Sequence, residues 1–198
     1  KQRIMAHGQQ IARVDFGEKE IKKLDKKTKG KIVDSLEKEI MDYDFVILPD
    51  YNKGFFDREI SKKIIDLANS YGIKTLVDPK PENFNFFKNC TVISPNEKEA
   101  EKITGMTYEN GKKALSKMGE ILTEKSGAKY VVITCGRDGM FSYHNGDSMF
   151  VRTTAKEVFD VTGAGDTFSA TLSLALAAGV DIHDAAVRNN LNPGAVQA

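Results

Sequence analysis

Residues 158–168, VFDVTGAGDTF, place a β-branched and aromatic run directly before three small residues and an aspartate. This order is typical of a strand that turns straight into a helix. Gly163, Ala164 and Gly165 carry no bulky side chain, so the backbone of the turn can approach a ligand closely. A helix N-terminus also presents free N–H groups and the positive end of the helix dipole. The stretch therefore predicts a site for a phosphate group.

Asp166 follows in the same first turn, and two interpretations of its carboxylate are open. It could accept a proton from an attacking hydroxyl, which together with an anion site is what phosphoryl transfer requires. It could equally offset the helix dipole, a contribution of about 0.3–1 kcal/mol. Two other phosphate motifs are excluded, because no Lys-Ser/Thr pair follows the glycines and the sixth residue of GAGDTF is Phe168.

Outward from this stretch, short apolar strands alternate with helical patterns. We expect strands at 45–50, 73–79, 91–96 and 130–136, and helices at 57–72, 97–105, 109–126, 163–179 and from about 181. Strands near 140–144 and 148–152 have no helix between them, so they predict a hairpin whose turn is HNGD (144–147). The alternation predicts an α/β fold, a mostly parallel sheet with helices on both faces.

Ligands of such sheets bind at the carboxyl ends of the strands. Five polar motifs each follow a strand and should share that edge: DYNKG (50–54), DPK (78–80), SPN (94–96), TCGRDG (134–139) and DVTGAGD (160–166). The sequence therefore predicts one site at one edge of the sheet.

Composition excludes several classes of protein. With 29 basic and 28 acidic residues among 198, the charge gives no argument for nucleic acid or an acidic membrane surface as a partner. The longest apolar run, 172–180, is too short to span a bilayer. Interleaved charges at 18–40 predict a solvated helix face. Cys90 and Cys135 lack metal-site or disulfide-framework spacing and predict buried free thiols, so we expect a cytoplasmic protein.

The segment DVTGAGDTF resembles the carboxyl-terminal signature of ribokinase-like carbohydrate kinases. Three further segments support the resemblance in the right order: SPNEKE (94–99), TCGRDG (134–139) and VRNN (187–190). Four more resemble one branch of that family, the kinases that phosphorylate heptose 7-phosphate at its anomeric hydroxyl: QQIARVDF (9–16), LPDYNKG (48–54), LVDPK (76–80) and ISPNEKEAEKITG (93–105). Members of that branch are often fused to a nucleotidyltransferase that makes ADP-heptose.

The resemblance implies specific roles at the phosphate-transfer end of the site. Asp166 would be the catalytic base, and the backbone of Gly163, Ala164 and Gly165 would form the anion hole. Asp160 and Thr162 fall where some members of the family hold a monovalent cation.

The nucleotide side of the site follows from the same resemblance. Thr134, Gly136 and Gly139 match a nucleotide-binding loop, and Asn190 matches an asparagine on the adenine side. Gly136 and Gly139 are also what a turn before a hairpin would need. Asn96 and Glu99 match a motif that organises the Mg²⁺–ATP complex, partly through water. The same pair is the sequence signature of a capping box, and both interpretations can hold together.

Two lysines follow strands at the same edge. Lys80 could meet an ATP phosphate as a point charge, and Lys53, with Asp50 nearby, could meet a sugar phosphate. A surface lysine whose stem covers apolar neighbours is the alternative for each.

The resemblance implies a ribokinase-like three-layer sandwich, truncated at its amino-terminal side. We expect one partial kinase domain, with 1–16 as the end of the lid strands and 17–198 as the nucleotide-binding and catalytic part. The family implies ATP and Mg²⁺ as cofactors, a sugar phosphate as partner, and lid strands that often mediate homodimerisation. The alternatives are a kinase for another sugar and a non-catalytic nucleotide-binding module.

Overall fold

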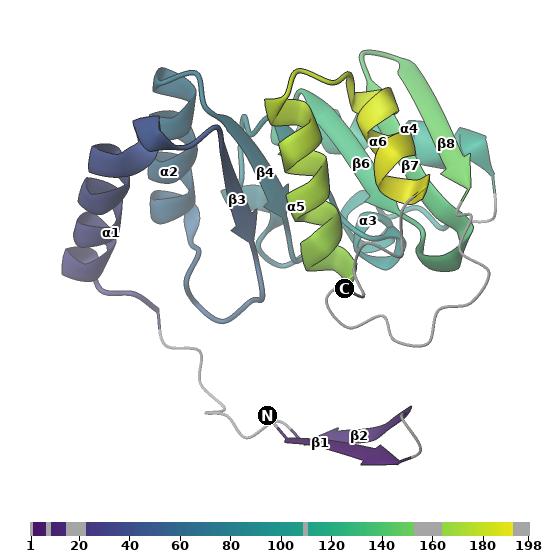
Figure 1. The fold of residues 1–198 in the computed structure, drawn as a ribbon, viewed down its shortest axis with the longest axis horizontal. Helices are drawn as coiled ribbons and strands as arrows, with labels where there is room; N and C mark the ends of the chain where they lie inside the picture. The colour runs from purple at the N-terminus through teal and green to yellow at the C-terminus, as the bar shows by residue number, and fades with distance from the viewer. Residues whose placement is uncertain (1, 7–8, 15–22, 109–110, 153–163, 192–198) are drawn as a thin grey trace.

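The computed structural model describes residues 2–6, 9–14, 23–108, 111–152 and 164–191, and its centre is a six-stranded sheet (Figure 1). The strand order is β3-β4-β5-β6-β7-β8, with β3 to β6 parallel and β7 and β8 antiparallel. The bounds are β3 (Phe45–Pro49), β4 (Lys74–Asp78), β5 (Val92–Ile93), β6 (Tyr130–Thr134), β7 (Gly139–His144) and β8 (Asp147–Arg152). The predicted strand order along the chain, including the terminal hairpin, is confirmed.

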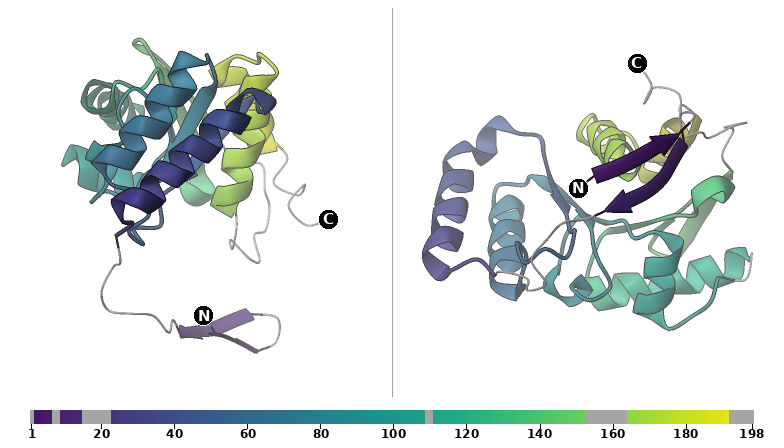
Figure 2. Two further views of the ribbon diagram at one scale, coloured as in Figure 1. Left: turned by 90° about the vertical axis from the view of Figure 1, so that its left-hand side faces the viewer. Right: turned by 90° about the horizontal axis from the view of Figure 1, so that it is seen from below.

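Helices cover both faces of this sheet (Figures 1 and 2). Residues of α2, α3 and α4 share one apolar core with the sheet, and residues of α5 and α6 share the other. Adjacent residues of β4 show the division, because Leu76 belongs to the second core and Val77 to the first. The bounds are α1 (Lys26–Glu39), α2 (Arg58–Ser70), α3 (Glu97–Thr104), α4 (Lys112–Ser126), α5 (Ala164–Ala177) and α6 (Ile182–Leu191). The three-layer sandwich is thus confirmed.

Local signals explain where the helices begin and end. Asp57 caps α2, because its side chain accepts hydrogen bonds from the N–H groups of Glu59 and Ile60. Gly105 closes α3 in the left-handed conformation at φ 74°, where a side chain would be strained. The hairpin turn is built the same way, with positive φ at Asn145 and Gly146.

The charged segment 18–40 departs from expectation at Lys29. We expected a solvated face, and most of the described side chains of α1 are exposed or half-buried. Lys29 is instead buried, with Nζ 2.5 Å from Asp57 Oδ2 and 3.4 Å from Glu59 Oε2. The cause is that α1 packs on α2, and an ammonium in that contact needs a carboxylate partner. The prediction is wrong for this residue because ion pairing between helices leaves no trace in the local pattern.

Two shorter features complete the fold. Strands β1 (Gln2–Ala6) and β2 (Gln9–Val14) form an antiparallel pair of their own, as expected for a strand pair within 1–16. Cys90 and Cys135 are buried free thiols, as predicted. Within the described part of the chain, no helix is long and apolar enough to cross a bilayer.

Two glycines inside helices allow a matched test of this packing. A Cβ on Gly119 of α4 would lie 2.7 Å from Cγ of Tyr143 on β7, whereas a Cβ on Gly30 of α1 would meet nothing within 4 Å. We expect Gly119→Ala to lower the free energy of unfolding by about 1–3 kcal/mol through overpacking. Gly30→Ala should raise it by about 0.5–1 kcal/mol through helix propensity. Urea denaturation measures both, and equal effects of the two variants would contradict the packing of α4 on β7.

Candidate functional site

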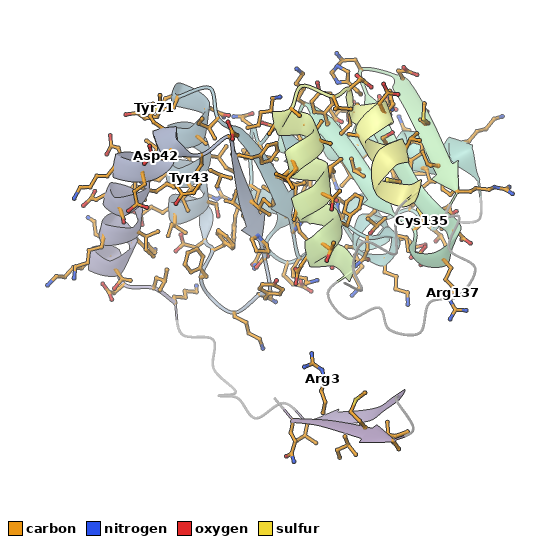
Figure 3. The ribbon with its side chains drawn as sticks, in the orientation of Figure 1. Arg3, Asp42, Tyr43, Tyr71, Cys135 and Arg137 are labelled. Carbon is orange, nitrogen blue, oxygen red and sulfur yellow. The ribbon has the colours of Figure 1, made fainter. Side chains whose placement is uncertain are left out.

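The carboxyl ends of the parallel strands bring the predicted motifs to one edge of the sheet. Figure 3 shows Cys135 and Arg137, from the loop after β6, toward this edge, and Asp42, Tyr43 and Tyr71 toward the opposite one. The loops after β3, β4 and β5 also begin at this edge, because β3 to β6 run in the same direction. The described part of α5 begins at this edge at Ala164, with Gly165 and Asp166 in its first turn.

Asp50 ties the first two loops together. Its side chain is buried, with 3% of the residue exposed. Oδ1 accepts a hydrogen bond from the Asn52 N–H at 2.8 Å, and Oδ2 accepts from the Lys80 N–H at 3.2 Å and from Asn83 Nδ2 at 2.9 Å. Both oxygens are therefore engaged within the protein, which makes Asp50 an organiser of the loops. The predicted contact of Asp50 with a sugar stays a prediction.

Asn96 and Glu99 form the capping box that the sequence allowed. Asn96 Oδ1 accepts from the Glu99 N–H at 3.0 Å, and Glu99 Oε2 accepts from the Asn96 N–H at 2.9 Å. The second oxygen of Glu99 faces away from the helix and pairs with Lys80 Nζ at 2.6 Å. Lys80 thus joins the edge of the site that Glu99 occupies, and its contact with an ATP phosphate stays a prediction.

Charge at this edge shifts the pKa of two groups. Burial opposes the charge of Lys80, but its hydrogen bond with Glu99 and the nearby Asp78 and Asp50 raise its pKa above the usual value. Asp78, the last residue of β4, has its pKa raised to about 6, mainly by burial and then by the charge of Glu99. Lys80 works against this shift, while Asp166 and Asp50 add to it. The edge therefore carries an excess of negative charge that a cation would relieve.

The oxygen donors fit a Mg²⁺ ion held through water and a nucleotide. Within the described ranges, no three His, Cys, Asp or Glu side chains converge closely enough to hold a metal ion by themselves. Both oxygens of Glu99 already accept hydrogen bonds from the protein. Mg²⁺ commonly keeps several waters and takes phosphate oxygens in addition to one or two carboxylates. Glu99 and Asn96 therefore suit the outer shell of such a complex.

Asp166 is placed beside the loop after β3. Its Oδ1 accepts a hydrogen bond from the Tyr51 hydroxyl at 2.9 Å, a contact between residues 115 positions apart. Asp166 also lies near enough to Asp78 to raise the pKa of that carboxyl. The structure thus brings Asp166, Lys80 and the loop after β3 into one neighbourhood, as the edge rule predicted.

The loop after β6 lies beside the capping box. The Thr134 N–H donates to the Pro95 carbonyl at 3.2 Å, and Thr134 pairs with Asn96 as an isolated parallel bridge. Gly136 (φ 52°) and Gly139 (φ 125°) both take positive φ. The turn interpretation of these glycines is therefore confirmed, and their nucleotide contacts stay a prediction. Cys135 directly precedes Gly136, and burial raises the pKa of its thiol to about 12, so it stays protonated at neutral pH.

The structure describes only some of the remaining predicted site residues. Gly163, Asp160 and Thr162 lie outside the described residues. Asn190 falls within α6, and Lys53 is exposed on the loop after β3.

Sequence reasoning missed Tyr51, Asp78 and Asn83, although all three lie in or beside quoted motifs. A polar residue ending the apolar strand LVD was a signal for Asp78. No local signal marks Tyr51 or Asn83, because their partners are distant in the sequence.

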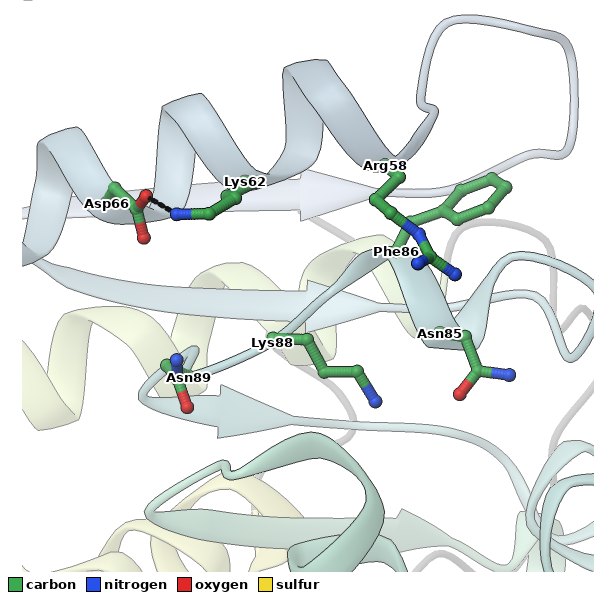
Figure 4. A pocket seen from close by; sticks show the side chains of 7 residues that line it. All are labelled: Arg58, Lys62, Asp66, Asn85, Phe86, Lys88 and Asn89. Atoms are coloured by element: carbon green, nitrogen blue, oxygen red, sulfur yellow. Dashed lines mark hydrogen bonds and ion pairs between the residues drawn. The ribbon is translucent and has the colours of Figure 1, made fainter.

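A hollow of about 280 Å³ lies between α2 and the segment formed by the 3₁₀ turn η2 (Phe84–Phe86) and the loop after it (Figure 4). Arg58, Lys62 and Lys88 give its lining a basic character. Lys62 pairs with Asp66, and Lys88 donates to the carbonyl of Lys125, so two of these charges are already used. None of the predicted site residues lines the hollow. We therefore place the chemistry at the carboxyl edge.

This fold and this arrangement of motifs define a class of kinase. The model of the pfkB family of carbohydrate kinases matches residues 22–190, and the chain belongs to that family.

Two curated relatives are similar to nearly the whole of this chain. The bifunctional protein HldE of a Nitratiruptor species is 38% identical over 196 residues, covering 99% of this chain and 41% of that protein. The bifunctional protein HldE of Helicobacter pylori is 38% identical over 186 residues, covering 93% of this chain and 39% of that protein. The chain thus spans about two fifths of the length of these curated relatives.

Solved structures agree on the fold. Phosphofructokinase-2 from Escherichia coli, in complex with substrates and products, superposes with a TM-score of 0.74 at 19% identity. The match covers 98% of this chain and 62% of that one.

The raised pKa of Asp78 generates a stability test. The folded protein holds this proton more tightly than the unfolded chain, so the stability it contributes is full below about pH 4 and is lost as the pH rises through about 6. Asp78→Asn carries no charge at any pH. We therefore expect it to raise the melting temperature at pH 7.5, without added divalent cation, and to leave it nearly unchanged near pH 4.

Asp42→Asn, at an exposed position before the other end of β3, is the matched control, because it removes a carboxylate that lies away from this edge. Calorimetry across the pH range measures the difference. A melting temperature of Asp78→Asn that stays below that of the wild type at pH 7.5 would contradict the crowding of charge around Asp78.

Proposed function

We propose that the protein containing this chain is an ATP-dependent sugar kinase that phosphorylates D-glycero-D-manno-heptose 7-phosphate at its anomeric hydroxyl. One observation carries the proposal: Asp166, in the first turn of α5, lies beside the loop after β3, which Asp50 fastens to the loop carrying Lys80. This contact supports a candidate base, a candidate anion-binding helix terminus and a candidate phosphate-binding lysine at one edge.

Asp166 acts as the general base in this proposal. Its carboxylate accepts the proton of the anomeric hydroxyl, and the sugar oxygen forms a bond to the γ-phosphorus of ATP as the bond to the β–γ bridging oxygen breaks and ADP leaves. The backbone N–H groups of Gly163, Ala164 and Gly165 form the anion hole in this proposal and stabilise the charge on the transferred group. The product is the 1,7-bisphosphate.

The nucleotide lies along the other half of the edge. Lys80 binds a phosphate oxygen, Thr134, Gly136 and Gly139 line the nucleotide loop, and Asn190 serves the adenine side. Asn96 and Glu99 would hold Mg²⁺ through water, and the ion supplies charge neutralisation for the phosphates when bound. A monovalent cation near Asp160 and Thr162 belongs to the same proposal. Residues 17–198 then form the nucleotide-binding and catalytic part, and 1–16 the end of the lid strands.

The sugar assignment rests on the segments that define the branch. LPDYNKG and LVDPK resemble the heptose branch, and the loop after β3 carries Lys53 as the candidate for binding a sugar phosphate. The relatives that share 38% identity with the chain are bifunctional by name, which agrees with a fusion to a nucleotidyltransferase. The same fold in phosphofructokinase-2 favours, as second candidate, a kinase for another sugar phosphate.

Replacement of the base tests the mechanism. In the full-length protein, Asp166→Asn should lower turnover by about 10²–10⁴-fold, since an amide cannot take the proton, while ATP binding by calorimetry stays near that of the wild type. Asp184→Asn is the matched control, because Asp184 is also an exposed aspartate in a first helical turn. Near-normal turnover of Asp166→Asn would end the assignment of the base.

A small substrate panel tests the sugar. Heptose 7-phosphate should be phosphorylated with a higher kcat/KM than fructose 6-phosphate or ribose. Preference for another sugar would favour the second candidate, and ATP binding without transfer to any sugar would favour a nucleotide-binding module.

Substitution of Glu99 separates its two roles. Gln also serves at this position of a capping box, so Glu99→Gln keeps the cap, but it removes the charged partner of Lys80 and should lower the free energy of unfolding by about 1–3 kcal/mol. The lost charge should lower turnover and raise the Mg²⁺ concentration for half-maximal activity. Glu97→Gln, in the same turn, is the control. An unchanged Mg²⁺ dependence with altered stability would show that Glu99 serves only the helix.

A further inference from the structure

The hydrogen bond between Tyr51 and Asp166 has no place in the mechanism so far. The Tyr51 hydroxyl donates to Asp166 Oδ1 at 2.9 Å and joins the loop after β3 to the first turn of α5. Across the described part of the chain, no protein donor reaches Oδ2 of Asp166 within hydrogen-bond distance. A carboxylate held at one oxygen in this way presents the other to an incoming hydroxyl.

Tyr51 is held in place by the loop that carries it. The preceding residue, Asp50, is buried and accepts three hydrogen bonds, one of them from the Asn52 N–H. Asn52 (φ 51°) and Gly54 (φ 81°) take left-handed conformations that shape the loop after Tyr51. The backbone on both sides of Tyr51 is therefore fixed, so its ring is directed by the loop.

Folding alone does not explain this contact. Tyr51 is 57% exposed, so water could satisfy both its hydroxyl and the carboxylate if the contact were lost. The ring contributes little to either apolar core, since it belongs to neither cluster. The acceptor of the Tyr51 hydroxyl is Asp166, the carboxylate that the proposed function assigns as the base.

We propose that Tyr51 is a positioning residue for phosphoryl transfer: its hydroxyl holds Oδ1 of Asp166, so that Oδ2 takes the proton of the sugar hydroxyl. This inference rests on the proposed function, in which Asp166 is the base. The sugar would then bind next to the loop after β3, which carries both Tyr51 and Lys53.

The charges around the pair support the direction of this hydrogen bond. The bond to Asp166 raises the pKa of Tyr51, and burial, the charge of Asp166 and that of Asp78 on β4 act in the same sense. Lys80, after β4, opposes the shift. The phenol therefore stays protonated and remains a donor throughout the neutral range.

Removal of one hydroxyl tests the inference in the full-length protein. Tyr51→Phe should lower kcat by about tenfold, the loss expected for one hydrogen bond to a charged group, and leave the KM for ATP unchanged. The KM for the sugar phosphate should also change less than kcat, because the hydroxyl acts on the base and not on the bound sugar. A purely structural tyrosine would not separate kcat from KM in this way.

Tyr43→Phe is the matched control. Tyr43 is 53% exposed and lies just before β3, at the opposite end of the strand from Tyr51. Its variant should keep the turnover of the wild type. A wild-type kcat of Tyr51→Phe, in an enzyme that Asp166→Asn inactivates, would overturn the inference and leave the proposed function intact.

A spectroscopic titration tests the contact without any sugar. The difference between the wild-type and Tyr51→Phe absorbance titrations isolates the phenolate of Tyr51. Asp166→Asn should lower the pKa of Tyr51 toward its ordinary value, because the neutral amide favours the protonated phenol less. An identical Tyr51 titration in wild type and Asp166→Asn would overturn the inference whatever the substrate proves to be.

Discussion

The arrangement of the site depends on the buried carboxylate of Asp50. A charge removed from water has to be satisfied by donors, and Asp50 finds three of them in two loops that leave neighbouring strands. The N–H of Lys80 is one of these donors, so the carboxylate that fixes the loop after β3 also fixes the loop after β4. The positions of Tyr51 and Lys80 are both consequences of this one desolvated charge.

Lys80 connects the loop after β4 to the N-terminus of α3. Its ammonium pairs with Glu99, which also caps α3, so the charge and the helix terminus share one carboxylate. Asp78 lies among these groups and raises the local density of negative charge. The electrostatics of the edge therefore favour cations and the phosphate complexes that carry them.

Most of the fold could be predicted from the sequence, but only part of the site. The periodic apolar runs and the stop at Gly105 identify strands and helices, because those signals are local. The location of the site at the carboxyl edge of the sheet could be predicted from the direction of the strands alone. The contacts of Lys29, Tyr51 and Asn83 could not be predicted, since each joins residues at least 28 positions apart and leaves no trace in composition or spacing.

The burial of Lys29 has a consequence for the loop after β3. Asp57, its partner, also caps α2, so the segment between Asp50 and Asp57 is anchored at both ends by hydrogen-bonded carboxylates. A loop of this length with two fixed ends has few alternative shapes. Its conformational entropy is therefore lost when the chain folds, and the arrival of a substrate need not order it again.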